Sequence, residues 1–214
     1  MVKLLVDDRE IEVKEGTTLL KACIDNDIYI PNLCFMDDMK ESVASCRMCF
    51  VEVEGEEKPV TSCTVKAASN MTVRTDTPVV RRLQRSAFRL LLSTHHVDCR
   101  NCQANKNCEL QEIAKLLKVG LKQKSLQQIL KDTAIDESHP CLIFFRNRCV
   151  LCGKCISVCK NKNQKTILTF VKRGFDTVVG FYGAGNRSAI SCGTCKSCVE
   201  ICPVGAITLK ESSF

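Results

Sequence analysis

The sequence contains no tryptophan and only two tyrosines, and aromatic residues make up 5% of its 214 positions. A core built from side chains alone would be modest for this length, so we expect bound inorganic material to help hold the fold. No stretch approaches eighteen consecutive apolar residues, so we expect no membrane span. The N-terminal segment also lacks the apolar run and the small-residue cleavage site of a secretory signal peptide.

Cysteine, by contrast, is abundant, with 17 residues in the chain. Such a density is typical of secreted disulfide frameworks, of structural zinc sites and of iron–sulfur clusters. The lack of a signal peptide disfavours the first, because disulfides are rare in reducing compartments. We therefore expect a cytoplasmic protein whose thiols bind metal.

The formal net charge of +7 would suit a nucleic-acid or anionic-membrane partner. The lysines and arginines are spread along the chain, however, rather than gathered in blocks. An oxidised cluster held by four thiolates carries about −2, and one with a neutral histidine in place of a thiolate carries about −1. Three clusters of the first kind and one of the second would offset the formal charge, so we predict no nucleic-acid partner.

Two matched cysteine runs carry the strongest signal, "CVLCGKCISVCK" at 149–160 and "CGTCKSCVEICP" at 192–203. Zinc usually takes its ligands as pairs on separate knuckles. Here each run offers three thiols at C-x2-C-x2-C and a fourth after three more residues. This is the bacterial ferredoxin pattern, in which the last cysteine of each run ligates the other cluster. The pattern predicts one [4Fe–4S] cluster on Cys149, Cys152, Cys155 and Cys202, and a second on Cys192, Cys195, Cys198 and Cys159.

The two runs differ in how they end. Pro203 follows the second run, where its fixed φ and missing N–H turn the chain away from the cluster. Lys160 stands at that place in the first run, so we expect the chain between the runs to form an insertion. Gly153 and Gly193 are expected to lie in tight turns around the two loops.

Four N-terminal cysteines have the form C-x11-C-x2-C-x13-C, namely Cys34, Cys46, Cys49 and Cys63. A four-cysteine zinc site is the alternative, and the central C-x2-C pair alone would not exclude it. The four follow a strand–turn–strand–helix start, as in a plant-type ferredoxin, so we predict a [2Fe–2S] cluster. The first gap departs from that pattern, because it is longer than the four residues of plant-type ferredoxins.

The middle of the chain, "HHVDCRNCQANKNC" at 95–108, has three cysteines without a fourth nearby. A histidine near cysteines is more often structural, but here it stands just past a predicted helix, one turn before the first thiol. The motif predicts a [4Fe–4S] cluster on His95, Cys99, Cys102 and Cys108, with the adjacent His96 as the alternative ligand. A neutral imidazole in place of a thiolate should raise the reduction potential, as it does in Rieske centres.

Apolar periodicity and capping residues predict the surrounding elements. Two strands joined by a turn at residues 7–9 lead to a helix over 19–27, capped by Thr17 or Thr18. The buried face of that helix is predicted to carry Leu19, Leu20, Cys23 and Ile24. Pro78 opens a longer helix, and a further one ends at Gly120. The apolar stripe predicted for the longer helix comprises Val80, Leu83, Ala87, Leu90 and Leu91.

These features predict an α+β protein with one [2Fe–2S] and three [4Fe–4S] clusters in three domains. Residues 1–78 would form a β-grasp [2Fe–2S] ferredoxin domain. Residues 79–138 would form a small helical domain with the His/Cys cluster, and residues 139–214 a bacterial-type two-cluster ferredoxin domain. His139 and Cys141 are expected to be structural, since free cysteine is often buried.

The ordered series of motifs resembles the N-terminal iron–sulfur region of the large peripheral-arm subunit of respiratory complex I. It is similar also to the N-terminal part of multicluster [FeFe]-hydrogenases and to the small iron–sulfur (diaphorase) subunit of NAD-linked bidirectional hydrogenases. "RGFDTVVGF", at 173–181, resembles the segment between the ferredoxin runs of that family, and the likeness covers essentially the whole chain. Spacing in the family favours His95 over His96 as the ligand.

The resemblance implies an electron-relay subunit between a flavin-containing, NAD(P)H-oxidising subunit and a second redox subunit. A soluble NAD(P)-linked hydrogenase is the favoured complex, with ferredoxin as a further partner if that complex bifurcates electrons. The alternatives are a bifurcating transhydrogenase, a formate dehydrogenase and a free-standing multicluster ferredoxin. No nucleophile–base constellation or complete nucleotide-binding glycine motif stands out, so we predict no catalytic residue, no further cofactor and no substrate site.

Overall fold

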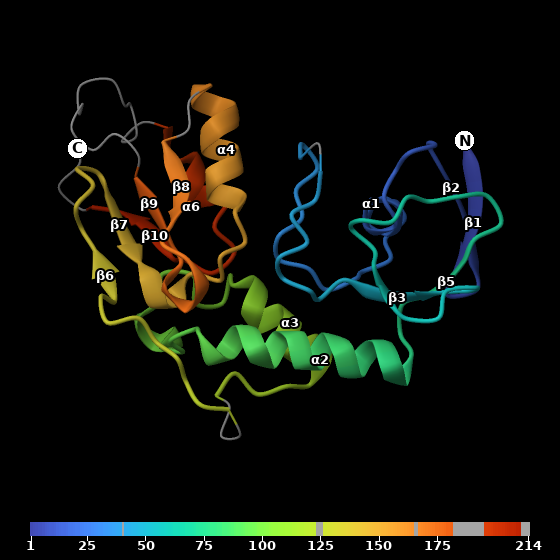
Figure 1. Cartoon of the computed structure of the whole chain (residues 1–214), viewed down its shortest axis with the longest axis horizontal. Helices are drawn as coiled ribbons and strands as arrows, with labels where there is room; N and C mark the ends of the chain where they lie inside the picture. Colours follow the sequence, from blue (N-terminus) through green and yellow to red (C-terminus); the bar gives the residue numbers. More distant parts are fainter. Residues whose placement is uncertain (40, 123–125, 165–166, 182–194, 211–214) are drawn as a thin grey trace. The chain divides into compact units, whose positions relative to one another are not determined.

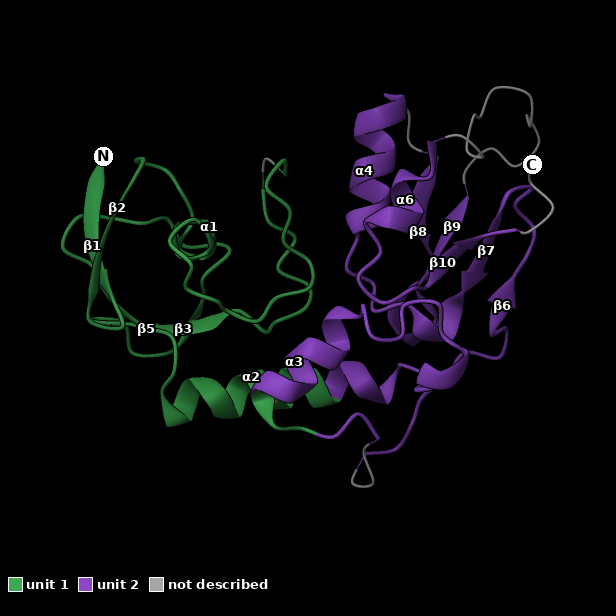
Figure 2. Ribbon diagram, turned by 180° about the vertical axis from the view of Figure 1, so that it is seen from behind, with its two compact units in different colours: residues 1–89, 117–119 green, residues 90–116, 120–214 purple. Residues whose placement is uncertain are grey.

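The computed structural model of the chain describes residues 1–39, 41–122, 126–164, 167–181 and 195–210 (Figure 1). It divides into two compact units, unit 1 with Met1–Arg89 and Leu117–Val119, and unit 2 with Leu90–Leu116 and Gly120–Phe214 (Figure 2). The chain passes from one unit to the other within helices α2 (Pro78–Ser93) and α3 (Glu109–Leu117). Strands and helices mix in both units, so the predicted α+β class is confirmed. The three-domain boundaries stay a prediction.

Unit 1 is built on a mixed five-stranded sheet with the strand order β2-β1-β5-β3-β4. Its strands are β1 (Val2–Val6), β2 (Arg9–Val13), β3 (Phe50–Val53), β4 (Val60–Thr61) and β5 (Thr72–Arg74). β1 pairs antiparallel with β2 and parallel with β5, while β3 pairs antiparallel with both β4 and β5. This mixed sheet beside a short helix is the predicted grasp-like arrangement.

The turn between β1 and β2 follows from its two aspartates. Asp7 and Asp8 both have positive φ, at 46° and 67°, as a two-residue type I′ hairpin turn requires. The Asp7 carboxylate accepts hydrogen bonds from the backbone N–H and the hydroxyl of Thr75. The turn is thereby tied to the end of β5, the strand that leads into α2.

Helix α1 (Leu19–Ile24) packs its buried side chains into the core of unit 1. Thr18 caps it, because the Thr18 hydroxyl accepts a hydrogen bond from the Lys21 N–H at 3.3 Å. The helix is shorter than predicted, since Asp27 takes a positive φ of 59° beyond its end. The prediction was wrong at Ile24, which is 38% exposed at the last helical position. The buried residues are Leu19, Leu20, Ala22 and Cys23.

Helix α2 begins as predicted at Pro78, behind Thr77, whose hydroxyl accepts a hydrogen bond from the Val80 N–H at 3.1 Å. Its buried stripe differs from the prediction, and Leu90 is 63% exposed. The buried side chains recur at every fourth position, at Val80, Gln84, Phe88 and Leu92. Gln84 can lie in this stripe because its amide donates to the Phe50 carbonyl of β3 at 3.3 Å.

Helix α3 ends at Leu117, and the prediction of its end at Gly120 was wrong. Lys118 takes the left-handed conformation after the last turn, with φ of 52°. The Arg85 Nε donates a hydrogen bond to the Leu117 carbonyl at 2.9 Å. This carbonyl is one of those in the last turn that have no N–H partner within the helix. A side chain from α2 thus does part of the capping that glycine usually provides.

Unit 2 contains an antiparallel sheet with the order β10-β7-β6 and a separate β8–β9 hairpin. Its strands are β6 (Ile135–Asp136), β7 (Leu142–Phe145), β8 (Leu168–Val171), β9 (Val178–Phe181) and β10 (Ile207–Leu209). β7 precedes the first ferredoxin run and β10 follows the second, so their pairing brings the two runs together. The β8–β9 hairpin lies in the predicted insertion.

Short helices complete unit 2, namely η1 (Cys99–Asn101), η2 (Arg146–Arg148), α4 (Lys154–Asn163), η3 (Gly174–Asp176) and α6 (Ser197–Glu200). α4 packs against both α6 and β8. Within the described ranges, no helix has the length and apolar character needed to cross a membrane.

Candidate iron–sulfur sites

The four N-terminal cysteines meet in the interior of unit 1. Each is at most 4% exposed, and the set comprises Cys34, Cys46, Cys49 and Cys63. The sulfurs of Cys34 and Cys46 are 3.5 Å apart, and Cys49 is hydrogen-bonded to Cys63. Ala44 and Arg47 take positive φ of 46° and 52°, which turns the connecting loop sharply. The thiols therefore form two pairs within one buried site.

The two thiols of each pair differ in pKa. The hydrogen bond between the Cys34 and Cys46 sulfurs lowers the pKa of Cys34 to about 5, and the one between Cys49 and Cys63 lowers the pKa of Cys63 to about 7. The same bonds, followed by burial, raise the pKa of Cys46 and Cys49. Each pair thus has one sulfur disposed to be the thiolate, the form that binds metal. Sets of four thiols are used both by [2Fe–2S] clusters and by zinc.

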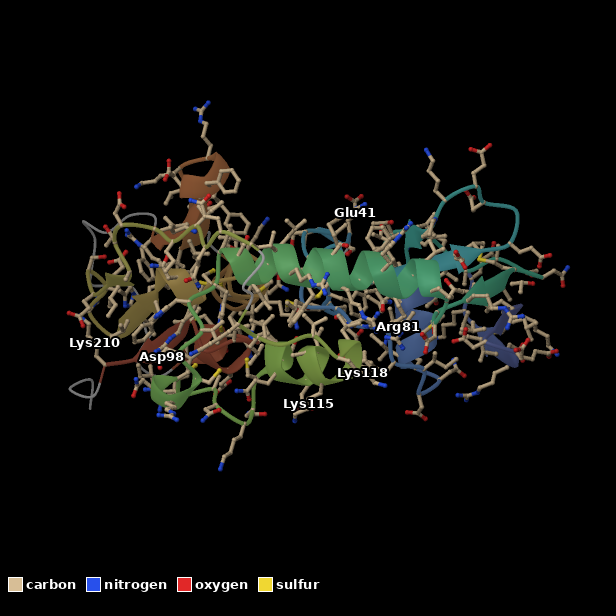
Figure 3. The ribbon with its side chains drawn as sticks, turned by 90° about the horizontal axis from the view of Figure 1, so that it is seen from below. Glu41, Arg81, Asp98, Lys115, Lys118 and Lys210 are labelled. Carbon is tan, nitrogen blue, oxygen red and sulfur yellow. The ribbon has the colours of Figure 1, made fainter. Side chains whose placement is uncertain are left out.

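The middle motif lines one small cavity of unit 2, with His95, Cys99, Cys102 and Cys108 all in its wall. Cys99 begins η1, and Cys108 immediately precedes α3. Asp98, labelled in Figure 3, stabilises this loop, since its carboxylate accepts hydrogen bonds from the Asn101 amide at 3.1 and 2.9 Å. The structure therefore brings together the four residues predicted for this site.

The two adjacent histidines differ in what their rings can do. The Nδ1 of His95 lies 2.9 Å from the Arg148 carbonyl, which can only accept, so Nδ1 carries the proton and Nε2 keeps a lone pair. Burial lowers the pKa of His95 to about 4, so the ring is neutral at pH 7. Metal-binding histidines are usually oriented in this way, through a hydrogen bond from the other ring nitrogen. His96 lines the same cavity but is exposed.

The first ferredoxin run meets the last cysteine of the second. Burial raises the pKa of Cys155, and the charges of Cys149, Cys152, Cys202 and Cys198 raise it further. Such coupling requires these sulfurs to be close, although Cys202 and Cys198 come from the other run, and the charge of Cys202 also raises the pKa of Cys149. The Leu151 N–H donates to the Cys149 sulfur at 3.4 Å, and the Ala206 N–H to the Cys202 sulfur at 3.2 Å.

The second ferredoxin set is described in part, because Cys192 and Gly193 lie outside the described residues. Cys159 is on α4 and is 8% exposed, and the Asn163 amide lies 3.5 Å from its sulfur. Cys198 is on α6, the helix that packs against α4, and Cys195 lies just before it. Gly153 caps α4 with φ of 77°, in the tight turn predicted for it.

Two short segments, around Arg148 and around Val204, contact the middle site and also carry ligands proposed for the first ferredoxin site. The Arg148 carbonyl orients the imidazole of the middle site, and the next residue is Cys149. The Cys102 sulfur lies 3.9 Å from the Val204 carbonyl, two residues after Cys202. Arg148 and Val204 were not singled out from the sequence, where the only available signal was their closeness to predicted ligands.

Gly205 lies in the second of these segments, and we expect Gly205→Ala to lower the free energy of unfolding by about 2 kcal/mol or more. Its φ is +62°, and an added Cβ would lie 2.8 Å from the Cβ of Ala104 and 3.4 Å from the Cys102 sulfur. Chemical denaturation of the holoprotein measures the change. Gly174→Ala is the matched control, because Gly174 has φ of +59° and nothing within 4 Å of an added Cβ. Equal losses in both variants would show that the close approach is unimportant.

The remaining histidine and cysteine of this region have structural contacts. The Nδ1 of His139 accepts hydrogen bonds from the backbone N–H groups of Cys141 and Leu142, each at 3.1 Å, at the start of β7. Its ring centroid lies 4.5 Å from that of Phe181. Cys23 is buried in the core of unit 1, and burial raises its pKa to about 12. These contacts agree with the structural roles predicted for them.

The donor sets fit iron–sulfur clusters in their chemistry. None of the cysteines that the structure describes forms a disulfide, so the sulfurs remain available as ligands. Within the same residues, no three His, Cys, Asp or Glu side chains converge on a point that would hold a single metal ion. Sets of four thiols, or of three thiols with a neutral imidazole, are ligand sets that iron–sulfur clusters use.

Two family models match the chain. Residues 1–78 match the model described as 2Fe-2S iron-sulfur cluster binding domain. Residues 84–121 match the model described as NADH-ubiquinone oxidoreductase-G iron-sulfur binding region, of the 4Fe-4S type. The chain therefore carries 2Fe–2S and 4Fe–4S binding domains, which favours iron over zinc at the N-terminal cysteines.

Similar proteins extend the likeness over the whole chain. NADP-reducing hydrogenase subunit HndD of Solidesulfovibrio fructosivorans is 32% identical over 220 residues, covering 99% of this chain and 36% of that protein. The NADH-ubiquinone oxidoreductase 75 kDa subunit of Reclinomonas americana is 31% identical over 215 residues, which are 100% of this chain and 30% of that protein. The chain thus spans about a third of the length of these curated relatives.

A solved structure matches in fold as well as in sequence. It is a chain of the crystal structure of NAD+-reducing [NiFe]-hydrogenase in the H2-reduced state, with a TM-score of 0.85 and 28% identity. The match covers 100% of this chain and 89% of that chain. The resemblance predicted from the motifs is therefore confirmed by both sequence and fold.

Proposed function

We propose that this chain, which resembles the iron–sulfur subunits of NADH-quinone oxidoreductases and NAD(P)-reducing hydrogenases, is a multicluster electron-relay subunit. Its partners would be a flavin-containing, NAD(P)H-oxidising subunit and a second redox subunit, in the cytoplasm. The proposal rests on the closeness of two sites. The carbonyls of Arg148 and Val204 contact the middle site, and both residues lie within two positions of proposed ligands of the first ferredoxin site. Donor sets that share walls suit electron transfer between neighbouring centres.

Four ligand sets follow from this proposal. The [2Fe–2S] cluster would be held by Cys34, Cys46, Cys49 and Cys63. One [4Fe–4S] cluster would be held by His95, Cys99, Cys102 and Cys108. The two others would be held by Cys149, Cys152, Cys155 and Cys202, and by Cys192, Cys195, Cys198 and Cys159. When bound, the clusters supply one-electron transfer, and no residue of this chain is proposed to be catalytic.

The protein's own part is to exclude water and to set the reduction potentials. The thiols of the N-terminal site are almost fully buried, and burial strengthens every electrostatic interaction around them. The N–H groups of Leu151 and Ala206 point at sulfurs of the first ferredoxin set, and such hydrogen bonds stabilise the more negative, reduced form. The neutral ring of His95 leaves its site one negative charge short of a four-thiolate site.

The proposed complex is a soluble NAD(P)-linked hydrogenase, with ferredoxin as a third partner if it bifurcates electrons. The likeness in fold to a chain of an NAD+-reducing [NiFe]-hydrogenase supports this choice. The likeness to the 75 kDa subunit of an NADH-ubiquinone oxidoreductase favours a second candidate, the same relay in a dehydrogenase complex without a hydrogenase subunit.

Metal analysis of the complex tests the proposal. The chain, tagged in its own host and purified anaerobically with its partners, should contain iron and flavin, and about fourteen irons should remain with this chain when it is isolated. Nickel in the complex would identify a hydrogenase, and molybdenum or tungsten a formate dehydrogenase. Iron and flavin without these metals would indicate a transhydrogenase or an [FeFe] enzyme. Zinc in place of iron would contradict the proposal.

A further inference from the structure

We propose that the guanidinium of Arg148 is the buried counter-charge of the His95/Cys99/Cys102/Cys108 site, and that it raises the reduction potential of the cluster held there. The inference rests on the proposed function, because it requires a cluster at that site. It goes beyond the ligand set, since it assigns the tuning of that cluster to a residue that is not a ligand. Arg148 is thus a positioning and tuning residue rather than a catalytic one.

Arg148 lies in the wall of the site and is held there from two sides. It ends η2, is 8% exposed, and lines the same cavity as the four proposed ligands. Its Nη2 donates to the Asn101 carbonyl at 2.9 Å, on the loop between Cys99 and Cys102. Its guanidinium carbon lies 4.1 Å from the ring centroid of Phe145. The charge is therefore fixed beside the ligand loop rather than free to reach solvent.

This buried cation has no carboxylate partner in the described part of the chain. None of the ion pairs formed there includes Arg148. Two nearby basic residues are paired, Arg146 with Asp136 at 2.7 Å and Lys154 with Glu109 at 3.3 Å. The carbonyl and the ring face that contact Arg148 offer only partial negative charge, and Asp98, the carboxylate that lines the same cavity, accepts its hydrogen bonds from the Asn101 amide. Because a buried and unpaired charge is strongly destabilising, a bound anion should complete the site.

A cluster held by three thiolates and a neutral imidazole supplies that anion, since its oxidised form carries about −1. Reduction adds one more negative charge to the cluster. A fixed positive charge beside it attracts the reduced form more strongly than the oxidised form, and the attraction is little screened in a buried site. The charge of Arg148 should therefore raise the reduction potential, in the same direction as the imidazole ligand.

The side chain and the backbone of Arg148 act on the site separately. The carbonyl orients His95 whatever side chain the residue carries. A substitution of the side chain can therefore remove the charge and leave the orientation of the ligand intact. Arg148→Gln removes the charge and keeps an amide that can donate to the Asn101 carbonyl, whereas Arg148→Lys keeps the charge.

The experiment is a redox titration of the holoprotein, monitored by electron paramagnetic resonance, on the wild type and both variants. We expect the signal of the His-ligated cluster to titrate at a more negative potential in Arg148→Gln and close to wild type in Arg148→Lys. Arg100→Gln is the matched control, because Arg100 also adjoins a proposed ligand but is exposed. Solvent screens its charge, so its removal should leave the potential nearly unchanged.

Each outcome decides the inference. An unchanged potential in a loaded Arg148→Gln variant, or equal shifts in Arg148→Gln and Arg148→Lys, would overturn it. If Arg148→Gln does not retain the cluster, retention in Arg148→Lys at the wild-type potential supports the counter-charge role, and loss from both variants overturns it. Absence of iron from this site in the wild type would instead refute the proposed function, so the two failures are distinguishable.

Discussion

His95→Ala should remove about four irons from the chain, whereas His96→Ala should remove none. The Nδ1 proton of His95 is committed to the Arg148 carbonyl and its Nε2 is left free, inside a cavity that three cysteines also line. Alanine leaves that cavity with the three cysteines of the proposed ligand set. Iron and acid-labile sulfide per chain measure the loss.

A second variant, His95→Cys, tests the effect of the ligand's charge, because it restores a fourth donor that carries one more negative charge than the imidazole. This variant should keep its iron and titrate at a more negative potential than wild type. His96→Ala is the matched control, since it changes the adjacent histidine of the same loop. Full iron content in His95→Ala together with a loss in His96→Ala would assign the ligand to His96 instead.

Cys202→Ala should remove about four irons, and they should be the same four that Cys149→Ala removes. The reason is that Cys202 lies close enough to the first run for its charge to act on both Cys149 and Cys155. The double variant Cys149→Ala/Cys202→Ala should therefore lose about four irons, not about eight. Iron content and the intensity of the reduced-cluster resonance signals provide the measurement.

The contrasting double variant, Cys192→Ala/Cys202→Ala, should lose about eight irons, because its two substitutions affect different clusters. Ligation of each cluster within a single run would reverse the two double-variant results, and that reversal would refute the crossed arrangement. Cys141→Ala is the control for a cysteine outside the sets, and it should retain the full iron content. Cys141 immediately precedes β7, the strand before the first run, and the hydrogen bonds that it forms are those of its backbone.

Local chemistry made much of unit 1 predictable. The two aspartates of the first turn, the threonine cap of α1 and the proline that opens α2 act within a few residues, so the sequence alone predicts them. The errors in α2 and α3 arose where a distant contact decided the outcome. Gln84 is buried because its amide donates a hydrogen bond to a carbonyl of β3, so the buried stripe of α2 differs from the prediction. Arg85 donates a hydrogen bond to the last carbonyl of α3, and that helix ends earlier than predicted.

The sequence by itself determined the types, spacing and order of the donors, because a ligand loop closes on its cluster over a few residues. Only the tertiary structure shows how donors from distant segments are brought together. The pairing of β7 with β10 carries Cys202 toward the first run, and η2 places the Arg148 carbonyl against His95. The burial of Arg148 without a carboxylate partner also appears only in three dimensions, since burial depends on segments far apart in the chain.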